Sequence, residues 1–239
     1  MKNNTKFSFM SISRLSVVAL VLASFTFTAC SDDDDDDNNT PAPTTARMMV
    51  THASPDAPGV DLLVDNVKLN TAALEFPNST PYITTFSGNR NVKVNVAGTS
   101  NTVINATLPL AANKSYSVFA IDAVANIGAL VVEDNLATPA PGKAHVRFIH
   151  LSPDAPAVDV AVDNGAVVFG NQAFKDYTPF TPLDAGDYDL EVRVAGTSTV
   201  ALDLPVITLQ AGKIYTVFAK GFLAGSGAQA LGAQIIVNN

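Results

Sequence analysis

Three residue types that can form a nucleophilic triad stand close together in the chain, as His52, Ser54 and Asp56. The same three types recur 98 residues later, at His150, Ser152 and Asp154. In a triad the imidazole takes the serine proton and the carboxylate orients the imidazole, so the three side chains must lie along one hydrogen-bonded line. Alternate residues of an extended segment project in similar directions instead, and the sequence contains no Gly-x-Ser-x-Gly turn to expose a nucleophile. The spacing therefore predicts a protein that is not an enzyme.

The prolines around the aspartate favour a structural role for this block. Pro55 and Pro58 in the first copy, and Pro153 and Pro156 in the second, have fixed φ angles and predict a rigid crossing between two strands. The aspartate between them is expected to accept hydrogen bonds from local backbone N–H groups in an Asx-turn. A ligand or calcium loop and a nucleophilic site stay open as alternatives for this block.

Carboxylates shared by the two copies are the candidate calcium ligands, because Ca²⁺ prefers oxygen donors. They are Asp56, Asp61, Asp65, Asp154, Asp159 and Asp163. Their spacing matches no EF-hand loop, and three histidines in the whole chain argue against a zinc cluster. We expect no cofactor and assign no metal firmly, with weak Ca²⁺ binding at these loops as an open alternative.

Phe119 and Phe218 are the candidate aromatic binding positions. In a period-two pattern they face opposite to Tyr116 and Tyr215, so they point outward if the tyrosines are buried. An outward aromatic ring suits stacking on a glycan or packing on a partner protein. The competing expectation is that the other domain or the last hairpin covers both rings.

An internal repeat organises the chain. Residues 52–66 and 150–164 are identical at 11 of 15 positions, and VNVAGTS at 94–100 recurs as VRVAGTS at 192–198. A third block, LAANKSYSVFA, recurs as LQAGKIYTVFA, so three blocks in one order indicate a duplicated domain. The expected boundaries are 46–137 for the first copy, 138–142 for a short stiff linker containing two prolines, and 143–239 for the second copy.

Both copies show the alternation that is typical of half-buried strands. Val158, Val160 and Val162 alternate with Asp159, Ala161 and Asp163, and the following Asn-Gly tolerates the positive φ of a tight hairpin. No mature segment sustains an amphipathic helical pattern. The predicted fold is all-β, with two tandem immunoglobulin-like or fibronectin-like antiparallel β-sandwiches of about seven strands each.

A repeated spacing of Leu, Gly or Asn, and Tyr supports the sandwich prediction. It occurs as Leu209, Gly212 and Tyr215, and earlier as Leu110, Asn113 and Tyr116. The pattern resembles the tyrosine corner of immunoglobulin-like domains, in which the hydroxyl returns to nearby backbone and Gly or Asn takes a positive φ. We therefore expect a structural role for both tyrosines.

The N-terminus has the features of an export signal. Residues 1–29 carry three basic residues ahead of an apolar run of 13 residues, from Leu15 to Phe27. A membrane-spanning helix needs about 20 residues, so the run predicts a signal peptide. The only cysteine, Cys30, follows Thr28 and Ala29, and this site resembles the bacterial lipobox. The resemblance implies acylation of Cys30 with lipid chains, palmitate among them, and an outer-membrane anchor.

Residues 30–45 predict a solvated tether. Six consecutive aspartates, Asp32 to Asp37, repel one another, and the Pro and Thr residues after them keep the chain open. An acidic run after the lipidated cysteine resembles a surface-export signal of Gram-negative lipoproteins, so we expect the protein to face the medium, with the periplasm as the alternative. Without the signal peptide the chain has 11 basic and 22 acidic residues, which argues against nucleic acid as a partner.

The His-x-Ser-Pro-Asp-Ala-Pro-x-Val-Asp block and the later Ala-Gly-Thr-Ser segment resemble the bacterial domain of unknown function numbered 4397, across both copies. The resemblance implies an exported, often lipid-anchored protein and brings no known activity. The leading interpretation is a lipid-anchored surface protein that displays two noncatalytic modules for adhesion or for binding a glycan or protein. A structural component of the cell envelope is the alternative, and a polymer hydrolase is the third hypothesis.

Overall fold

A computed structural model describes residues 42–239, which form one compact unit. The expected signal peptide, Cys30 and the aspartate run lie outside these described residues. Within residues 42–239, no helix is long and apolar enough to cross a membrane. Strands make up most of this part of the chain, and its two helical turns are the short 3₁₀ segments η1 (Val124–Asn126) and η2 (Gly227–Gln229).

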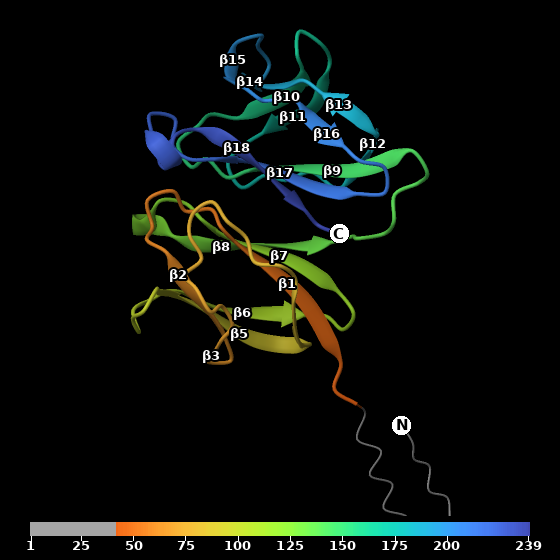
Figure 1. The fold of residues 1–239 in the computed structure, drawn as a ribbon. Coiled ribbons are helices and arrows are strands. Elements are labelled where there is room, and N and C mark those ends of the chain that lie inside the picture. The colour runs from red at the N-terminus through yellow and green to blue at the C-terminus, as the bar shows by residue number, and fades with distance from the viewer. Residues whose placement is uncertain (1–41) are drawn as a thin grey trace, which may run out of the picture. The chain divides into compact units, whose positions relative to one another are not determined.

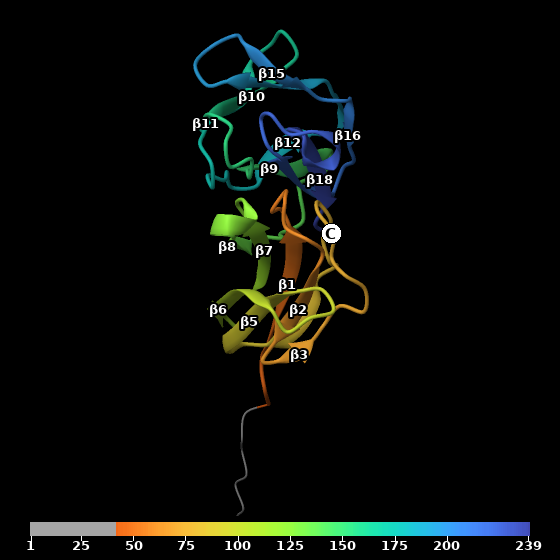
Figure 2. The ribbon, with the colours of Figure 1, turned by 90° about the vertical axis from the view of Figure 1, so that its left-hand side faces the viewer.

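The first repeat forms two four-stranded sheets (Figures 1 and 2). Its strands are β1 (Thr45–His52), β2 (Val60–Val64), β3 (Val67–Lys68), β4 (Ile83–Phe86), β5 (Gly88–Val96), β6 (Thr102–Leu110), β7 (Ser115–Ile121) and β8 (Gly128–Asp134). One sheet has the order β4-β1-β7-β8 and the other has the order β3-β2-β5-β6. Apolar residues from both sheets, such as Leu62, Val94 and Val118, form the core of this repeat.

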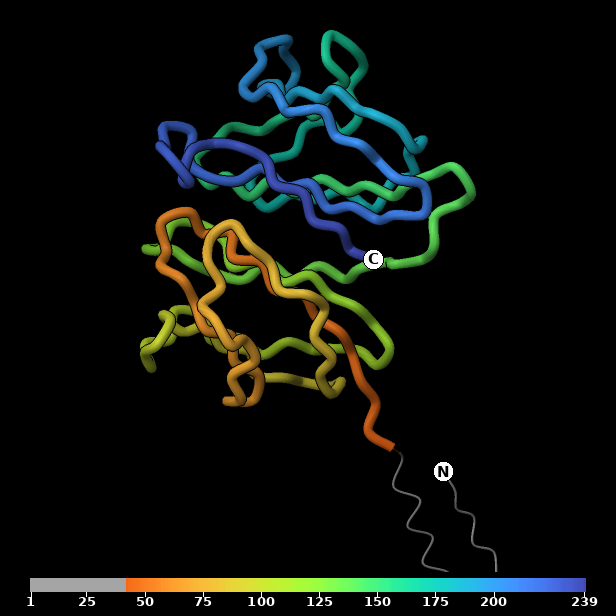
Figure 3. The backbone as a smooth tube through the Cα atoms, viewed as in Figure 1, coloured from red at the N-terminus to blue at the C-terminus, as the bar shows by residue number. Residues whose placement is uncertain are grey.

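The second repeat has the same plan. Its strands are β9 (Lys143–His150), β10 (Val158–Val162), β11 (Val167–Gln172), β12 (Thr181–Asp184), β13 (Gly186–Tyr188), β14 (Leu190–Val194), β15 (Val200–Asp203), β16 (Ile207–Leu209), β17 (Ile214–Lys220) and β18 (Gly232–Val237). The sheets have the orders β12-β9-β17-β18 and β11-β10-β14-β15, and β13 pairs separately with β16. Phe148, Val192 and Val217 belong to its core. Figure 3 follows the chain from β8 through residues 135–142 into β9.

These sheets confirm the prediction of two all-β sandwich repeats. One pairing in each repeat differs from the antiparallel expectation, because β1 runs parallel to β7 and β9 runs parallel to β17. The two strands of each such pair are far apart in sequence, so no hairpin imposes an antiparallel direction on them. The remaining pairings between the strands are antiparallel.

The local turn predictions are also confirmed. Asn164 has a φ of 50° in the hairpin between β10 and β11, and the equivalent Asn66 has a φ of 66° between β2 and β3. Asparagine is one of the few residues that adopt this left-handed conformation readily. The chain can therefore reverse direction over the two residues between β2 and β3 and over the four residues between β10 and β11.

Each repeat contains the expected tyrosine corner. The Ala111 N–H donates to the Tyr116 hydroxyl at 3.0 Å, and the Gln210 N–H donates to the Tyr215 hydroxyl at 3.1 Å. Gly212 lies between the second pair with a φ of 80°, where a side chain would be strained. Both tyrosine rings pack in the core of their own repeat.

A third apolar cluster joins the two repeats. It combines Ala53, Phe119, Ile121 and Val132 of the first repeat with Ile149, Leu151 and Phe218 of the second. We call this set the inter-repeat cluster. It lies on the sheet faces that do not belong to either sandwich core, so burial of these side chains couples one repeat to the other.

Candidate functional site

The two histidines of the repeated block are buried structural residues. His52 ends β1 and His150 ends β9, and neither is exposed to solvent. Their Nε2 atoms lie 3.0 Å from the carbonyl oxygens of Pro58 and Pro156. Because a carbonyl oxygen only accepts, Nε2 carries the proton and donates it. Burial lowers the pKa of both imidazoles, so the neutral form is favoured.

The serine and aspartate of the block do not bond to its histidine, and buried Ser54 Oγ makes no hydrogen bond within residues 42–239. Ser152 Oγ donates to the Gly221 carbonyl at 2.6 Å, and Asp154 Oδ1 accepts from the Leu223 N–H at 2.8 Å. Asp56 makes the equivalent bond to the N–H at the start of η1, also at 2.8 Å. The predicted local Asx-turn is therefore wrong, because each aspartate fastens a connection almost 70 residues away. Among the described residues, no hydrogen bond links the histidine of a block to its serine.

Asp61 holds a turn of its own repeat. Its Oδ2 accepts from the Gly98 N–H at 3.0 Å, and its Oδ1 lies 2.8 Å from Lys68 Nζ. The hydrogen bonds from Lys68 and then from Gly98 lower the pKa of this carboxyl. This contact explains why the Ala-Gly-Thr-Ser turn recurs together with the block.

Asp159 holds the equivalent turn of the second repeat. Its two oxygens accept from the Asn171 N–H at 2.6 Å and from the Gly196 N–H at 2.9 Å. These two bonds lower the pKa of the Asp159 carboxyl, with the Asn171 bond the larger cause. The Asp159 carboxylate thus accepts hydrogen bonds from backbone N–H groups on two loops.

The last pair of candidate aspartates lies in the hairpin turns. Asp65 accepts from the Asn91 N–H and pairs with Arg90 at 3.0 Å, while Asp163 accepts from the Asn164 amide at 2.8 Å. Within residues 42–239, no three His, Cys, Asp or Glu side chains gather in a way that could hold a metal ion. The structure therefore does not bring the six candidate aspartates together as a cation site.

Phe119 and Phe218 are not outward-facing, and the prediction of an aromatic binding position at these residues is wrong. Both have an exposed fraction of 0%, and their rings meet edge to face with centroids 6.1 Å apart. They do point away from the tyrosines, as the period-two pattern predicts. The other repeat covers the sheet face from which they project, as the competing expectation has it.

A buried ion pair also crosses between the repeats. Arg147 Nη1 of β9 lies 2.7 Å from Asp134 Oδ1 at the end of β8, and both side chains have an exposed fraction of 1% or less. Arg147 donates further to Ser117 Oγ and to Thr216 Oγ1, each at 2.8 Å. Its guanidinium lies over the ring of Phe180, 4.4 Å from the centroid. Such a charge pair is stable in the interior only when its remaining donors and acceptors are satisfied.

Tyr82 and Asn238 extend this network to the surface. The Tyr82 hydroxyl donates to Asp134 Oδ2 at 2.6 Å and accepts from Asn238 Nδ2 at 3.1 Å. Burial and the neighbouring Asp134 charge raise the pKa of Tyr82. Asn238 accepts in turn from Thr216 Oγ1 at 2.8 Å. The network therefore ties the C-terminal segment to the first repeat.

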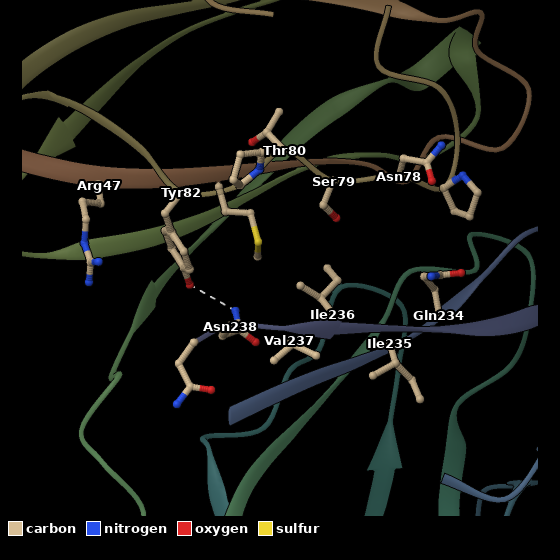
Figure 4. Close-up of a pocket in the computed structure, with 14 residues that line it drawn as sticks. Arg47, Asn78, Ser79, Thr80, Tyr82, Gln234, Ile235, Ile236, Val237 and Asn238 are labelled. Atoms are coloured by element: carbon tan, nitrogen blue, oxygen red, sulfur yellow. Dashed lines mark hydrogen bonds between the residues drawn. The ribbon is translucent and has the colours of Figure 1, made fainter. Parts of the chain in front are cut away.

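A groove of about 470 Å³ opens beside Tyr82 and Asn238. Residues 78–82 of the first repeat form one wall, and residues 234–238 of β18 and the segment after it form the other (Figure 4). The lining residues are Arg47, Met49, Pro77, Asn78, Ser79, Thr80, Pro81, Tyr82, Gln234, Ile235, Ile236, Val237, Asn238 and Asn239. We call it the inter-repeat groove, and it is the candidate functional site.

The inter-repeat groove combines polar and apolar side chains with one cation, Arg47. Its described lining side chains are amides, hydroxyls, apolar groups and the Arg47 guanidinium, and none of these side chains carries a carboxylate. The side-chain amides of Asn78 and Gln234 make no hydrogen bond within residues 42–239 and lie on opposite walls. Each amide offers two donors and one acceptor oxygen to a ligand.

Neither the groove nor the buried ion pair was predicted from the sequence. One signal was present, because Arg147 stands between the apolar residues Val146 and Phe148 in the segment that forms β9. A charged residue at such a position requires a buried partner. The groove has no sequence signature, because its walls come from segments about 150 residues apart.

No curated protein matches the sequence significantly. Among solved structures, the Bacillus anthracis TIE protein overlaps 74% of this chain and 34% of its own, at 11% identity and a TM-score of 0.24. The chain thus spans only about a third of that protein. A family 26 carbohydrate-binding module from Eubacterium rectale Amy13K, solved with maltoheptaose, overlaps 80% of this chain and 96% of its own, also at 11% identity and a TM-score of 0.24. Both TM-scores are too low to compare sites.

The family comparison is specific. The domain of unknown function DUF4397 matches twice, over residues 46–161 and 153–239. The first match extends past residues 135–142 into β9 and β10, so the two matched ranges overlap. Together they cover both sandwiches and confirm the predicted duplication. The chain therefore belongs to the DUF4397 family and contains two copies of that domain.

Proposed function

We propose that this protein is a lipid-anchored, noncatalytic binding protein of the cell surface, and that the inter-repeat groove takes a glycan. The observation that carries the proposal is the groove lining, in which the Asn78 and Gln234 amides lie on opposite walls among hydroxyl and apolar groups, with Arg47 at one end and no side-chain carboxylate. Sugar hydroxyls donate and accept hydrogen bonds together, as side-chain amides do. A groove bordered by two coupled repeats also holds its shape without a ligand, which lowers the entropic cost of binding.

The ligand is tested with the mature chain on an array of neutral oligosaccharides. For a glycan that binds, Asn78→Ala and Gln234→Ala are each expected to weaken the affinity about tenfold, the effect of losing one or two hydrogen bonds. Asn101→Ala is the matched control, because Asn101 is an exposed amide outside the groove. Equal affinity in all three variants, or no binding by any neutral glycan at millimolar concentration, would refute the proposed ligand.

The anchor and the location rest on the sequence of residues 1–45. Acylation of Cys30 would hold the protein on the outer membrane, and the six aspartates would direct it to the outer face. Cys30→Ala is expected to release the protein from the membrane fraction. Protease treatment of intact cells should remove the wild-type repeats, and it should spare a variant in which Asp32 to Asp37 are replaced by Ser and Asn. Protection of both proteins would indicate the periplasmic alternative.

A structural role in the envelope is the second candidate. The buried Arg147–Asp134 pair and the inter-repeat cluster favour it, because they join two sandwiches into a stiff unit that could act as a spacer. This alternative expects stable envelope partners after crosslinking in cells and no soluble ligand. A glycan that binds in the groove would instead support the leading proposal.

A further inference from the structure

The contacts between the repeats relate equivalent residues to each other. Phe119 and Phe218 occupy the same position of the two copies, 99 residues apart, and their rings contact each other with centroids 6.1 Å apart. In an interface with two-fold symmetry, a residue near the axis contacts its own equivalent. The sheets that meet are also equivalent, because β4-β1-β7-β8 corresponds to β12-β9-β17-β18.

A second equivalent pair lies beside the first. Ser117 and Thr216 are also 99 residues apart, and both are fully buried. The Arg147 guanidinium donates to one hydroxyl through Nη2 and to the other through Nε, each at 2.8 Å. One side chain of the second repeat thus lies between two equivalent hydroxyls, as expected close to a two-fold axis.

The charges break this symmetry. Arg147 corresponds to Met49, 98 residues earlier, and Met49 is 2% exposed. Asp134 lies opposite Ser115 in the β7–β8 ladder, and its equivalent next to β17 is Asn238, whose N–H donates to the Ile214 carbonyl. The first repeat therefore supplies only the anion of the buried pair, and the second supplies only the cation.

We infer that the two repeats form a two-fold dimer interface within one chain, and that the divided ion pair restricts this interface to one first repeat and one second repeat. Two first repeats would bury two Asp134 carboxylates beside Met49 without Arg147, because the Arg47 guanidinium of the first repeat is exposed and donates to Ser115 Oγ at 3.0 Å instead. Two second repeats would bury two Arg147 guanidiniums beside Asn238 with no anion. A buried charge without its partner is strongly unfavourable. The charges therefore disfavour both like pairs, which are the pair of two first repeats and the pair of two second repeats. The partner that fits the β4-β1-β7-β8 face is therefore a second repeat, from the same chain or from another copy.

The inference is tested in the full mature chain, with residues 138–141 replaced by a site for a specific protease and the linker cut after folding. Gel filtration and native mass spectrometry then measure the association of the two halves. Asp134→Asn gives the first repeat the residue type that the second repeat has at the equivalent position, Asn238. Arg147→Met gives the second repeat the residue type that the first repeat has at Met49. Each single variant leaves one buried charge unpaired and is expected to weaken association by about 100-fold or more.

The double variant, Asp134→Asn with Arg147→Met, tests whether the charges determine which repeats pair, apart from their effect on the strength of association. It has no unpaired charge, so it should associate at least about tenfold more tightly than either single variant. Pairs of two first halves or two second halves should appear in its mass spectrum and be missing from that of the wild type. The matched control neutralises the exposed pair Lys114–Glu133, with Nζ and Oε1 2.7 Å apart, and should leave association unchanged.

The inference is overturned if wild-type halves form like pairs, if they separate at micromolar concentration, or if the double variant forms no like pairs. Circular dichroism checks that each variant folds. If a single variant unfolds, the double variant still decides, because the like pairs depend only on removal of both charges.

Discussion

Replacement of Phe119 by alanine tests whether the inter-repeat cluster couples the two sandwiches. The side chain is fully buried, and it belongs to the cluster between the repeats and to neither sandwich core. Removal of a buried phenylalanine costs about 3–5 kcal/mol, which includes the cavity that remains. The lost edge-to-face contact with Phe218 is part of that cost.

The cost should fall on the coupling between the repeats. We expect the wild type to unfold in one cooperative transition, because the inter-repeat cluster and the Arg147–Asp134 pair link the sandwiches. In Phe119→Ala the link is weaker by most of the 3–5 kcal/mol, so calorimetry and urea titration followed by circular dichroism should show two separate transitions.

Val118→Ala is the matched control for this experiment. Val118 is the preceding residue of β7, and its side chain packs in the core of the first repeat. Its truncation should lower the stability of that repeat without separating the transitions. The reasoning is refuted if Phe119→Ala costs less than about 1 kcal/mol, or if both variants show the same unfolding profile.

Three further predictions concern single contacts. Below the ordinary histidine pKa of about 6.5, the unfolded chain binds protons at His52 and His150, whereas the folded chain resists them because burial lowers both pKa values. The free energy of unfolding should therefore fall between pH 7 and pH 5, by up to about 1.4 kcal/mol per pH unit for each histidine, and a flat series of urea midpoints would contradict this. Tyr215→Phe removes the acceptor for the Gln210 N–H and should lower the free energy of unfolding by about 1 kcal/mol, as measured by urea titration. An unchanged free energy of unfolding would contradict this prediction. Asp154→Ala should accelerate amide hydrogen exchange in the connection after β17, and unchanged exchange there would show that this carboxylate does not hold it.

Local features of the fold could be predicted from the sequence because they depend on neighbouring residues. The alternation of Val158, Val160 and Val162 identifies a strand, and the asparagine after it permits the hairpin turn. The spacing that ends in Tyr215 predicts that its hydroxyl bonds to nearby backbone, and the Gln210 N–H is the donor. The repeat itself predicts that each of these features occurs twice.

Tertiary structure alone decided what covers each face and which distant groups meet. Alternation placed Phe119 on the side opposite Tyr116, but the pattern is the same whether solvent or another sheet lies against that side. The partners of Asp56, Asp134 and Arg147 likewise come from segments that local propensity does not bring together. The inter-repeat groove depends on the same packing, since its walls meet only after both repeats have folded. The physical reason is that the period-two pattern of a strand determines only the side of the sheet to which each side chain points. Burial and charge pairing depend on which other part of the folded chain packs against that side.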